Sequence, residues 1–115
     1  MELNLVRGDT WNTTFVLRER RASVYVAPTP INLTGATARL QLRTTVTGPV
    51  VIEATTINSK LVVGGTNGLI ELAMPPADTV GLLGTYLWDL ELTYADGVIK
   101  TVAGGRLVVT ADITR

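Results

Sequence analysis

The fold is indicated most clearly by one stretch, Asp78-Thr79-Val80-Gly81-Leu82-Leu83-Gly84-Thr85-Tyr86-Leu87-Trp88. The proline pair just before it can open a single helical turn over residues 75–80. After the glycine at position 84, large side chains recur at every second residue, which indicates a half-buried strand. A short helical turn that leads through a glycine into a strand with an inward tyrosine is typical of a chain crossing between two packed sheets.

In immunoglobulin-like sandwiches this arrangement is the tyrosine corner, in which the tyrosine ring packs into the core and its hydroxyl bonds to backbone upstream. In an antibody domain a cysteine follows two residues after the tyrosine, and here Trp88 occupies that place after Tyr86. We therefore expect the Trp88 ring to fill the space between the sheets that a disulfide would otherwise occupy.

The rest of the chain also favours strands. There are 18 Thr and 14 Val residues, and β-branched side chains prefer the pleated conformation. No window holds a sustained helical pattern of apolar residues. We predict a single domain over residues 1–115 that is all-β, an immunoglobulin-like antiparallel β-sandwich of about seven to nine short strands. The expected strands cover residues 3–7, 11–18, 24–27, 37–43, 50–55, 60–63, 69–74, 85–94 and 98–111.

A hairpin is predicted where Asp96-Gly97 separates two β-rich runs, because this pair suits a two-residue type I′ turn with positive φ at both residues. With that loop, Tyr94 faces Ile99 and Leu92 faces Thr101. The strand before the loop then carries Tyr86, Trp88, Leu90, Leu92 and Tyr94 on one face. The glycines at 104 and 105 are expected to form a β-bulge, after which Leu107 and Val109 resume the inward pattern.

Composition excludes several classes of function. The chain has 115 residues, ten Lys and Arg against ten Asp and Glu, and neither His nor Cys. Thiol nucleophiles, thiolate metal sites and the commonest general base are therefore absent. A net charge of zero argues against a nucleic-acid partner, which requires a surplus of Lys and Arg. We expect a non-enzymatic protein that uses no cofactor and no metal.

The start of the chain lacks the basic and apolar regions of a signal peptide. Its longest apolar runs, such as Val50-Val51-Ile52, are far shorter than the roughly 20 residues of a membrane-spanning helix. We accordingly expect no membrane partner and synthesis in the cytoplasm.

Three groups of residues are candidates for chemical sites. Arg7-Gly8-Asp9 is the tripeptide of cell-adhesion ligands, but between two strands it suits a turn. The glycines in residues 64–68 lack the Lys-Ser/Thr of a phosphate loop and favour a hairpin turn. A third group consists of carboxylates that could flank a sugar or hold calcium, although a solvated outer face explains them more simply; its members are Asp89, Glu91, Asp96 and Asp112.

The cluster of Arg18, Arg20 and Arg21 has two interpretations that the sequence leaves equal. It can contact the acidic rim of a partner, or it can keep an edge strand soluble.

Four segments of the chain resemble a known family. They are 6–11 (Val-Arg-Gly-Asp-Thr-Trp), 30–37 (Pro-Ile-Asn-Leu-Thr-Gly-Ala-Thr), 84–93 (Gly-Thr-Tyr-Leu-Trp-Asp-Leu-Glu-Leu-Thr) and the close at 105–115. Together they are similar to the N-terminal domain of the phage baseplate upper proteins and to related small virion proteins of tailed phages. The resemblance implies an immunoglobulin-like sandwich that assembles in the virion and does no catalysis.

Two departures from the family pattern matter. Baseplate upper proteins continue into segments that carry receptor-binding proteins, whereas this sequence ends at Arg115, and residues 20–30 are longer than the expected turn. The resemblance implies a homo-oligomer whose partners are copies of itself and other virion proteins, with edge strands and termini making the contacts. The residues expected at the assembly surface are Leu3, Leu5, Arg18, Arg20, Arg21 and Tyr25, while Gly84, Tyr86, Trp88, Asp96 and Gly97 are expected to be structural.

The leading hypothesis is a structural protein in the tail, baseplate or fibre-attachment region of a tailed-phage virion. A capsid decoration protein is the first alternative. A carbohydrate- or receptor-binding module that uses Trp11, Tyr25 or Tyr94 as stacking platforms is the second.

Overall fold

The computed structural model describes residues 2–17 and 31–112. In that part of the chain, eight strands account for most residues, with one four-residue helix and one 3₁₀ turn at Gly65–Asn67. The strands and the helix are β1 (Glu2–Val6), β2 (Trp11–Val16), β3 (Thr37–Arg43), β4 (Val50–Thr55), β5 (Leu61–Val63), β6 (Leu69–Met74), α1 (Pro76–Thr79), β7 (Gly84–Thr93) and β8 (Ile99–Thr110).

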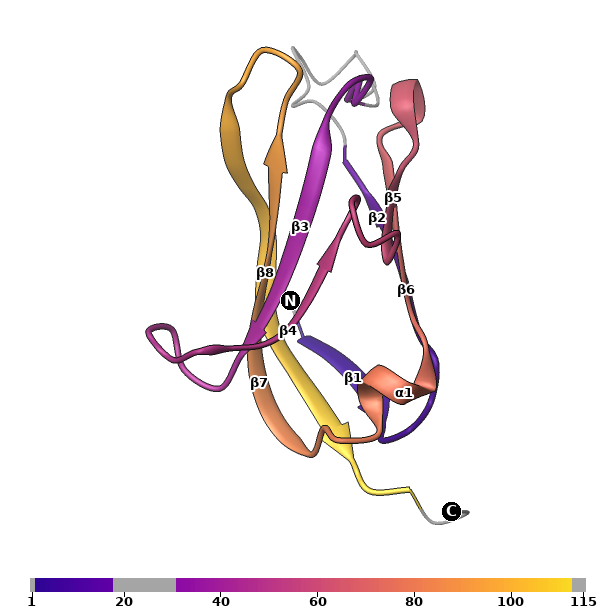
Figure 1. The fold of residues 1–115 in the computed structure, drawn as a ribbon, viewed down its shortest axis with the longest axis vertical. Coiled ribbons are helices and arrows are strands. Elements are labelled where there is room, and N and C mark those ends of the chain that lie inside the picture. The colour runs from indigo at the N-terminus through magenta and orange to yellow at the C-terminus, as the bar shows by residue number, and fades with distance from the viewer. Residues whose placement is uncertain (1, 18–30, 113–115) are drawn as a thin grey trace, which may run out of the picture.

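The strands form two sheets that pack as a β-sandwich (Figure 1). The larger one, sheet A, has the order β1-β8-β7-β3-β4, and the smaller one, sheet B, has the order β2-β6-β5. The predicted immunoglobulin-like sandwich is confirmed. All strand pairs are antiparallel except one, because β1 runs parallel to β8, with Leu3 beside Leu107 and Leu5 beside Val109. The predicted strands agree with the observed ones to within two residues, except 24–27, which lies outside the described residues.

The tyrosine corner is present as predicted. The chain leaves β6, makes the α1 turn and enters β7 at Gly84, whose φ of 98° is accessible to glycine at little cost. The Tyr86 hydroxyl then accepts a hydrogen bond from the backbone N–H of Leu83 at 3.0 Å. The Tyr86 ring is buried. This hydrogen bond ties the connection between the sheets to the strand that follows it.

The interior joins the two sheets through aromatic contact. The rings of Phe15 on β2 and Trp88 on β7 lie 5.6 Å apart between their centroids, at an interplanar angle of 46°. Because Phe15 belongs to sheet B and Trp88 to sheet A, this contact takes the place of an inter-sheet disulfide, as expected. The other inward residues alternate along their strands as predicted, and they include Ala38, Leu40, Leu42, Ala54, Ile70, Leu72, Met74, Leu90, Leu92, Leu107 and Val109.

The β7–β8 hairpin exists, but its predicted turn type was wrong. Tyr94 and Val98 close a three-residue loop, with Tyr94 N–H bonded to the Val98 carbonyl and Gly97 N–H to the Tyr94 carbonyl. Only Gly97 has positive φ, at 90°, because the Asp96 side chain instead accepts the Val98 N–H. The register next to the loop is therefore Thr93 with Ile99, one residue away from the predicted pairing.

The predicted bulge at Gly104-Gly105 was also wrong. Both glycines pair regularly, Gly104 with Asp89 and Gly105 with Trp88. The register shifts instead between Leu90 and Glu91, where Val102 is the extra residue of β8. This bulge compensates for the three-residue loop, and it returns Leu107 and Val109 to the inward face.

We expect Gly97→Val to lower the free energy of unfolding by at least about 1 kcal/mol, because a β-branched residue is strained at a φ of 90°. Gly81→Val is the matched control, since Gly81 lacks positive φ and a Cβ there meets no atom within 4 Å. Urea denaturation measures both variants, and equal stability of the two would refute the assigned turn.

Tyr86→Phe is expected to lower the free energy of unfolding by about 1–2 kcal/mol, because the Leu83 N–H loses its acceptor in a part-buried position. Tyr94→Phe serves as the control, since the Tyr94 hydroxyl has no hydrogen bond within the described part of the chain. The thermal midpoints of the two variants compare them directly, and a Tyr86→Phe midpoint equal to that of the control contradicts the assignment.

Candidate functional site

The outer face of sheet A carries charges whose sign alternates from strand to strand. Each strand contributes exposed or half-buried residues of a single sign, and each neighbouring strand has the opposite sign. We call this set the charge ladder: Glu53 on β4, Arg39 and Arg43 on β3, Asp89 and Glu91 on β7, Arg106 on β8 and Glu2 on β1.

Register places opposite charges beside each other along the ladder. Arg39 faces Glu91 across β3 and β7, and its Nε lies 3.9 Å from a Glu53 carboxylate oxygen on the other side. At the far end, Arg106 donates a hydrogen bond to the Glu2 carboxylate at 3.1 Å. Opposite charges on directly facing strand residues stabilise a sheet modestly. Asp89 and Glu91 therefore share a solvated face as expected, and their charge faces basic strands of the same chain.

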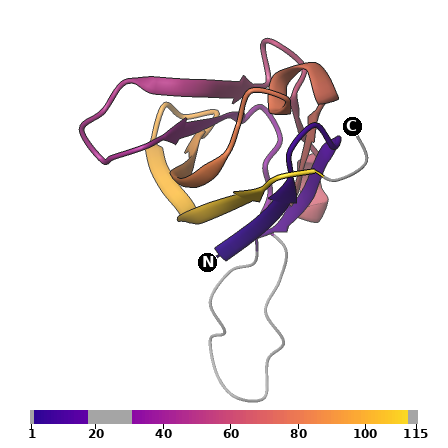
Figure 2. The ribbon, with the colours of Figure 1, turned by 90° about the horizontal axis from the view of Figure 1, so that it is seen from below.

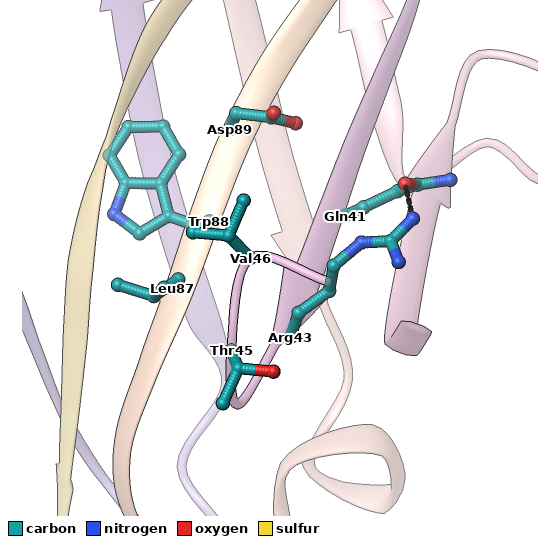
Figure 3. A pocket seen from close by; sticks show the side chains of 7 residues that line it. All are labelled: Gln41, Arg43, Thr45, Val46, Leu87, Trp88 and Asp89. Carbon is teal, nitrogen blue, oxygen red and sulfur yellow. Dashed lines mark hydrogen bonds between the residues drawn. The ribbon is translucent and has the colours of Figure 1, made fainter. Parts of the chain in front are cut away.

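A shallow pocket of about 250 Å³ lies on this face beside the loop that joins β3 to β4 (Figure 3). Arg43 holds the loop, because its guanidinium donates to the Gly48 carbonyl and, at 2.9 Å, to the Gln41 side-chain oxygen. Gln41 in turn donates to Glu53 at 2.7 Å. The pocket is lined by Gln41, Arg43, Thr45, Val46, Leu87, Trp88 and Asp89.

The pocket offers hydrogen bonds and modest apolar contact to a ligand. The side chains of Asp89 and Thr45 provide a carboxylate and a hydroxyl, with Leu87 and Val46 as apolar neighbours. Trp88 does not offer its ring, because the indole is 3% exposed and points away from Gln41 and Arg43 in Figure 3. The polar groups of Gln41 and Arg43 already form hydrogen bonds with each other, with Gly48 and with Glu53. These two side chains therefore hold the β3–β4 loop in place and are not directed at a substrate.

The four carboxylates considered from the sequence are not brought together. Asp89 and Glu91 lie on β7, and Asp96 lies in the β7–β8 loop. Asp112 follows β8, where it accepts a hydrogen bond from Arg7 Nε at 2.9 Å. Within residues 2–17 and 31–112, no three side chains of Asp, Glu, His or Cys are close enough to hold a metal ion.

Arg7-Gly8-Asp9 forms the turn that the sequence favoured. Asp9 N–H bonds to the Val6 carbonyl, and Gly8 adopts a φ of 83°. The Asp9 carbonyl accepts the Thr79 hydroxyl at 2.7 Å, while Arg7 is paired with Asp112. The tripeptide therefore joins the connection after β1 to helix α1 and to the end of β8. Residues 64–68 likewise form the β5–β6 hairpin connection that the sequence predicted.

Two residues expected at the assembly surface face the interior. Leu5 is 8% exposed, and Leu3 is partly buried against the core. Both point inward because β1 completes sheet A beside β8, and alternate residues of a strand face opposite sides. The remaining members of that set, Arg18, Arg20, Arg21 and Tyr25, lie outside the described residues.

The expected stacking role of Trp11 is contradicted by its burial. Trp11 is 3% exposed and belongs to the core, so it cannot present its ring to a sugar. Tyr94 is half-buried against the core, and Tyr25 is outside the described residues.

The role of the basic residues of the charge ladder could not be recognised from the sequence. Arg39 and Arg43 alternate with buried leucines, a pattern that by itself indicates only the solvent face of a strand. Their pairing with β4 and β7 could be recognised only with the strand order.

No protein-family model matches the chain, and no curated protein matches its sequence. Among solved structures, the chain is similar to CopC from Methylosinus trichosporium OB3b, at 15% identity and a TM-score of 0.43, over 68% of this chain and 66% of that one. It is also similar to extracellular domains 3–5 of Drosophila OTK, at 14% identity and a TM-score of 0.38, over 94% of this chain and 32% of that one. The chain thus covers less than two thirds of either structure.

Within residues 2–17 and 31–112, no helix has the length and hydropathy that are needed to span a membrane.

Reversal of one charge in the ladder tests its contribution. We expect Glu2→Arg to lower the free energy of unfolding by about 0.5–1 kcal/mol at low salt, because it sets two cations side by side on β1 and β8. The double variant Glu2→Arg with Arg106→Glu is expected to restore the stability, and about 1 M NaCl should remove the difference. A double variant as unstable as the single one would contradict the pairing.

Proposed function

We propose that the chain is a non-enzymatic structural protein of a tailed-phage virion, in the tail, baseplate or fibre-attachment region. The observation that carries this proposal is the resemblance of residues 6–11, 30–37, 84–93 and 105–115 to the N-terminal domain of the baseplate upper proteins.

Most of the segments that carry the resemblance lie near one another in the fold. Residues 6–11 make the connection from β1 to β2, residues 84–93 are β7, and the described residues from 105 onward belong to β8 and its end. Residues 31–37 lead into β3. Three of the segments thus belong to sheet A or lead into it, while residues 6–11 connect β1 of sheet A to β2 of sheet B.

The surface chemistry is consistent with assembly. The charge ladder gives sheet A a face of both signs, and the whole chain is neutral. Because the sequence contains no His, no side chain of ordinary pKa changes its charge between about pH 6 and pH 8. Contacts made by such a surface depend on ionic strength more than on pH in this range.

A capsid decoration protein has the same chemistry and is the alternative location. In the carbohydrate- or receptor-binding alternative, Trp11 cannot serve as a stacking platform because its ring is buried.

Localisation tests the proposal. Antibodies against the purified chain should label intact tailed particles released by the host that carries the gene, with immunogold at the tail end in electron micrographs. Antibody preabsorbed with the chain is the control, and peptide mass spectrometry of the same purified particles gives the copy number relative to the major capsid protein.

Label over the capsid would replace the proposal by the decoration alternative. Absence of the chain from purified particles, with the chain present in the infected lysate, would overturn both.

A further inference from the structure

The two edges of sheet A differ in their capacity to accept another strand. At one edge, the Asn58 side chain occupies the free side of β4, where its amide donates to the Glu53 carbonyl at 3.1 Å and accepts from the Thr55 N–H at 2.9 Å. The amide thereby occupies two of the outward backbone groups that an added strand would use. Asn58 is in turn fixed by accepting the Lys60 N–H at 3.1 Å.

The beginning of β4 is protected by other means. The register between β3 and β4 shifts at Leu42 and Arg43, which leaves Val51 as an extra residue on β4. Such a bulge twists an edge away from regular pairing. Pro49, immediately before the strand, has no N–H to offer. Together, these features hinder regular pairing at both ends of the β4 edge.

The β1 edge has none of these features. Its register with β8 is regular from Glu2 to Val6, without a proline or a bulge. Arg7 N–H bonds to the Thr110 carbonyl, so the backbone of Leu3, Leu5 and Arg7 points toward β8. Since alternate residues of a strand direct their backbone groups to opposite sides, the backbone groups of Glu2, Asn4 and Val6 point away from β8. Of these groups, the Val6 carbonyl already accepts the Asp9 N–H at 3.0 Å.

We propose that β1 pairs with β1 of a second copy of this chain, antiparallel and about a twofold axis at Asn4. The backbone hydrogen bonds between the copies then run from Asn4 N–H to the Asn4 carbonyl in each direction and from Val6 N–H to the Glu2 carbonyl in each direction. The Val6 carbonyl keeps the Asp9 N–H of its own chain. The two copies of sheet A become one continuous sheet across the axis.

The side chains of β1 suit this register. Glu2 faces Val6 of the other copy, so no like charges stand opposite each other, and each Glu2 keeps Arg106 of its own chain. The Asn4 side chains, which are exposed, meet at the axis and can bond to each other. On the inner face, Leu3 faces Leu5 of the other copy, and Leu3 is only partly buried in its own chain. Pairing therefore gives Leu3 an apolar neighbour.

The blocked β4 edge limits the assembly of sheet A to two copies. An isologous pair uses the same edge of each copy, and after pairing both outer ends of the joined sheet are capped β4 strands. A closed dimer results, and extension of sheet A into a filament is prevented.

This proposal rests on the assembly role proposed above for its biological meaning, but it is tested on the isolated chain. A chain absent from virions can still dimerise through β1, and a monomeric chain can still occur in virions, so the two failures are distinguishable.

Sedimentation velocity of the full chain, from tens to hundreds of micromolar, is the experiment. We expect a monomer–dimer equilibrium whose dissociation constant rises at least tenfold in Asn4→Asp, because two carboxylates then face each other at the axis, with partial recovery in high salt. Asn4→Pro should abolish the dimer, since it removes an outward N–H that has no acceptor among residues 2–17 and 31–112. Circular dichroism and thermal melts establish that both variants are folded.

The matched control is Thr14→Pro. Thr14 directs its N–H to the open side of β2, because Leu17 N–H bonds toward β6 at the Gly68 carbonyl, so this variant should keep the dimer. Three results would each overturn the proposal: a monomeric wild-type chain at hundreds of micromolar, a larger oligomer, or a dimer that both folded Asn4 variants leave unchanged.

Discussion

The structure depends on the aromatic contact between its two sheets. The ring centroids of Phe15 and Trp88 lie 5.6 Å apart in the interior, with Trp88 on the central strand of sheet A and Phe15 on the edge strand β2 of sheet B. A ring pair contributes through burial and edge interactions and needs no oxidising compartment. The contact also requires both rings to be held in a fixed orientation. The tyrosine corner contributes to this, because the hydrogen bond of Tyr86 fixes the start of β7 two residues before Trp88.

The sandwich could be predicted from the sequence because each signal for it lies within a short stretch of residues. Period-two alternation in β3, β6 and β7, and the glycine that leads into Tyr86, depend on a few neighbouring residues each. The details of the β7–β8 hairpin were missed for a physical reason. Asp96 satisfies a backbone N–H with its side chain, which leaves only Gly97 in the left-handed region, and the Val102 bulge restores the pattern at a distance.

The candidate surfaces were predicted less well, because they depend on strand order. Leu3 and Leu5 were predicted to contact a neighbouring subunit. Because β1 pairs with β8, the alternation of side chains along β1 directs both leucines toward the core. Trp11 looked like a stacking platform and is a core residue. Asn58 could not be recognised as an edge cap from the sequence, since its partners at Glu53 and Thr55 are defined only by the direction in which β4 faces outward.

The charge ladder has a consequence for how the chain selects its topology during folding. With signs that alternate in the order β4, β3, β7, β8, β1, any arrangement that placed β3 beside β8, or β4 beside β7, would set like charges against each other. The hydrophobic pattern alone does not distinguish such arrangements, because their inner faces are similarly apolar. The surface charges therefore disfavour these misfolded topologies, which the core would accept.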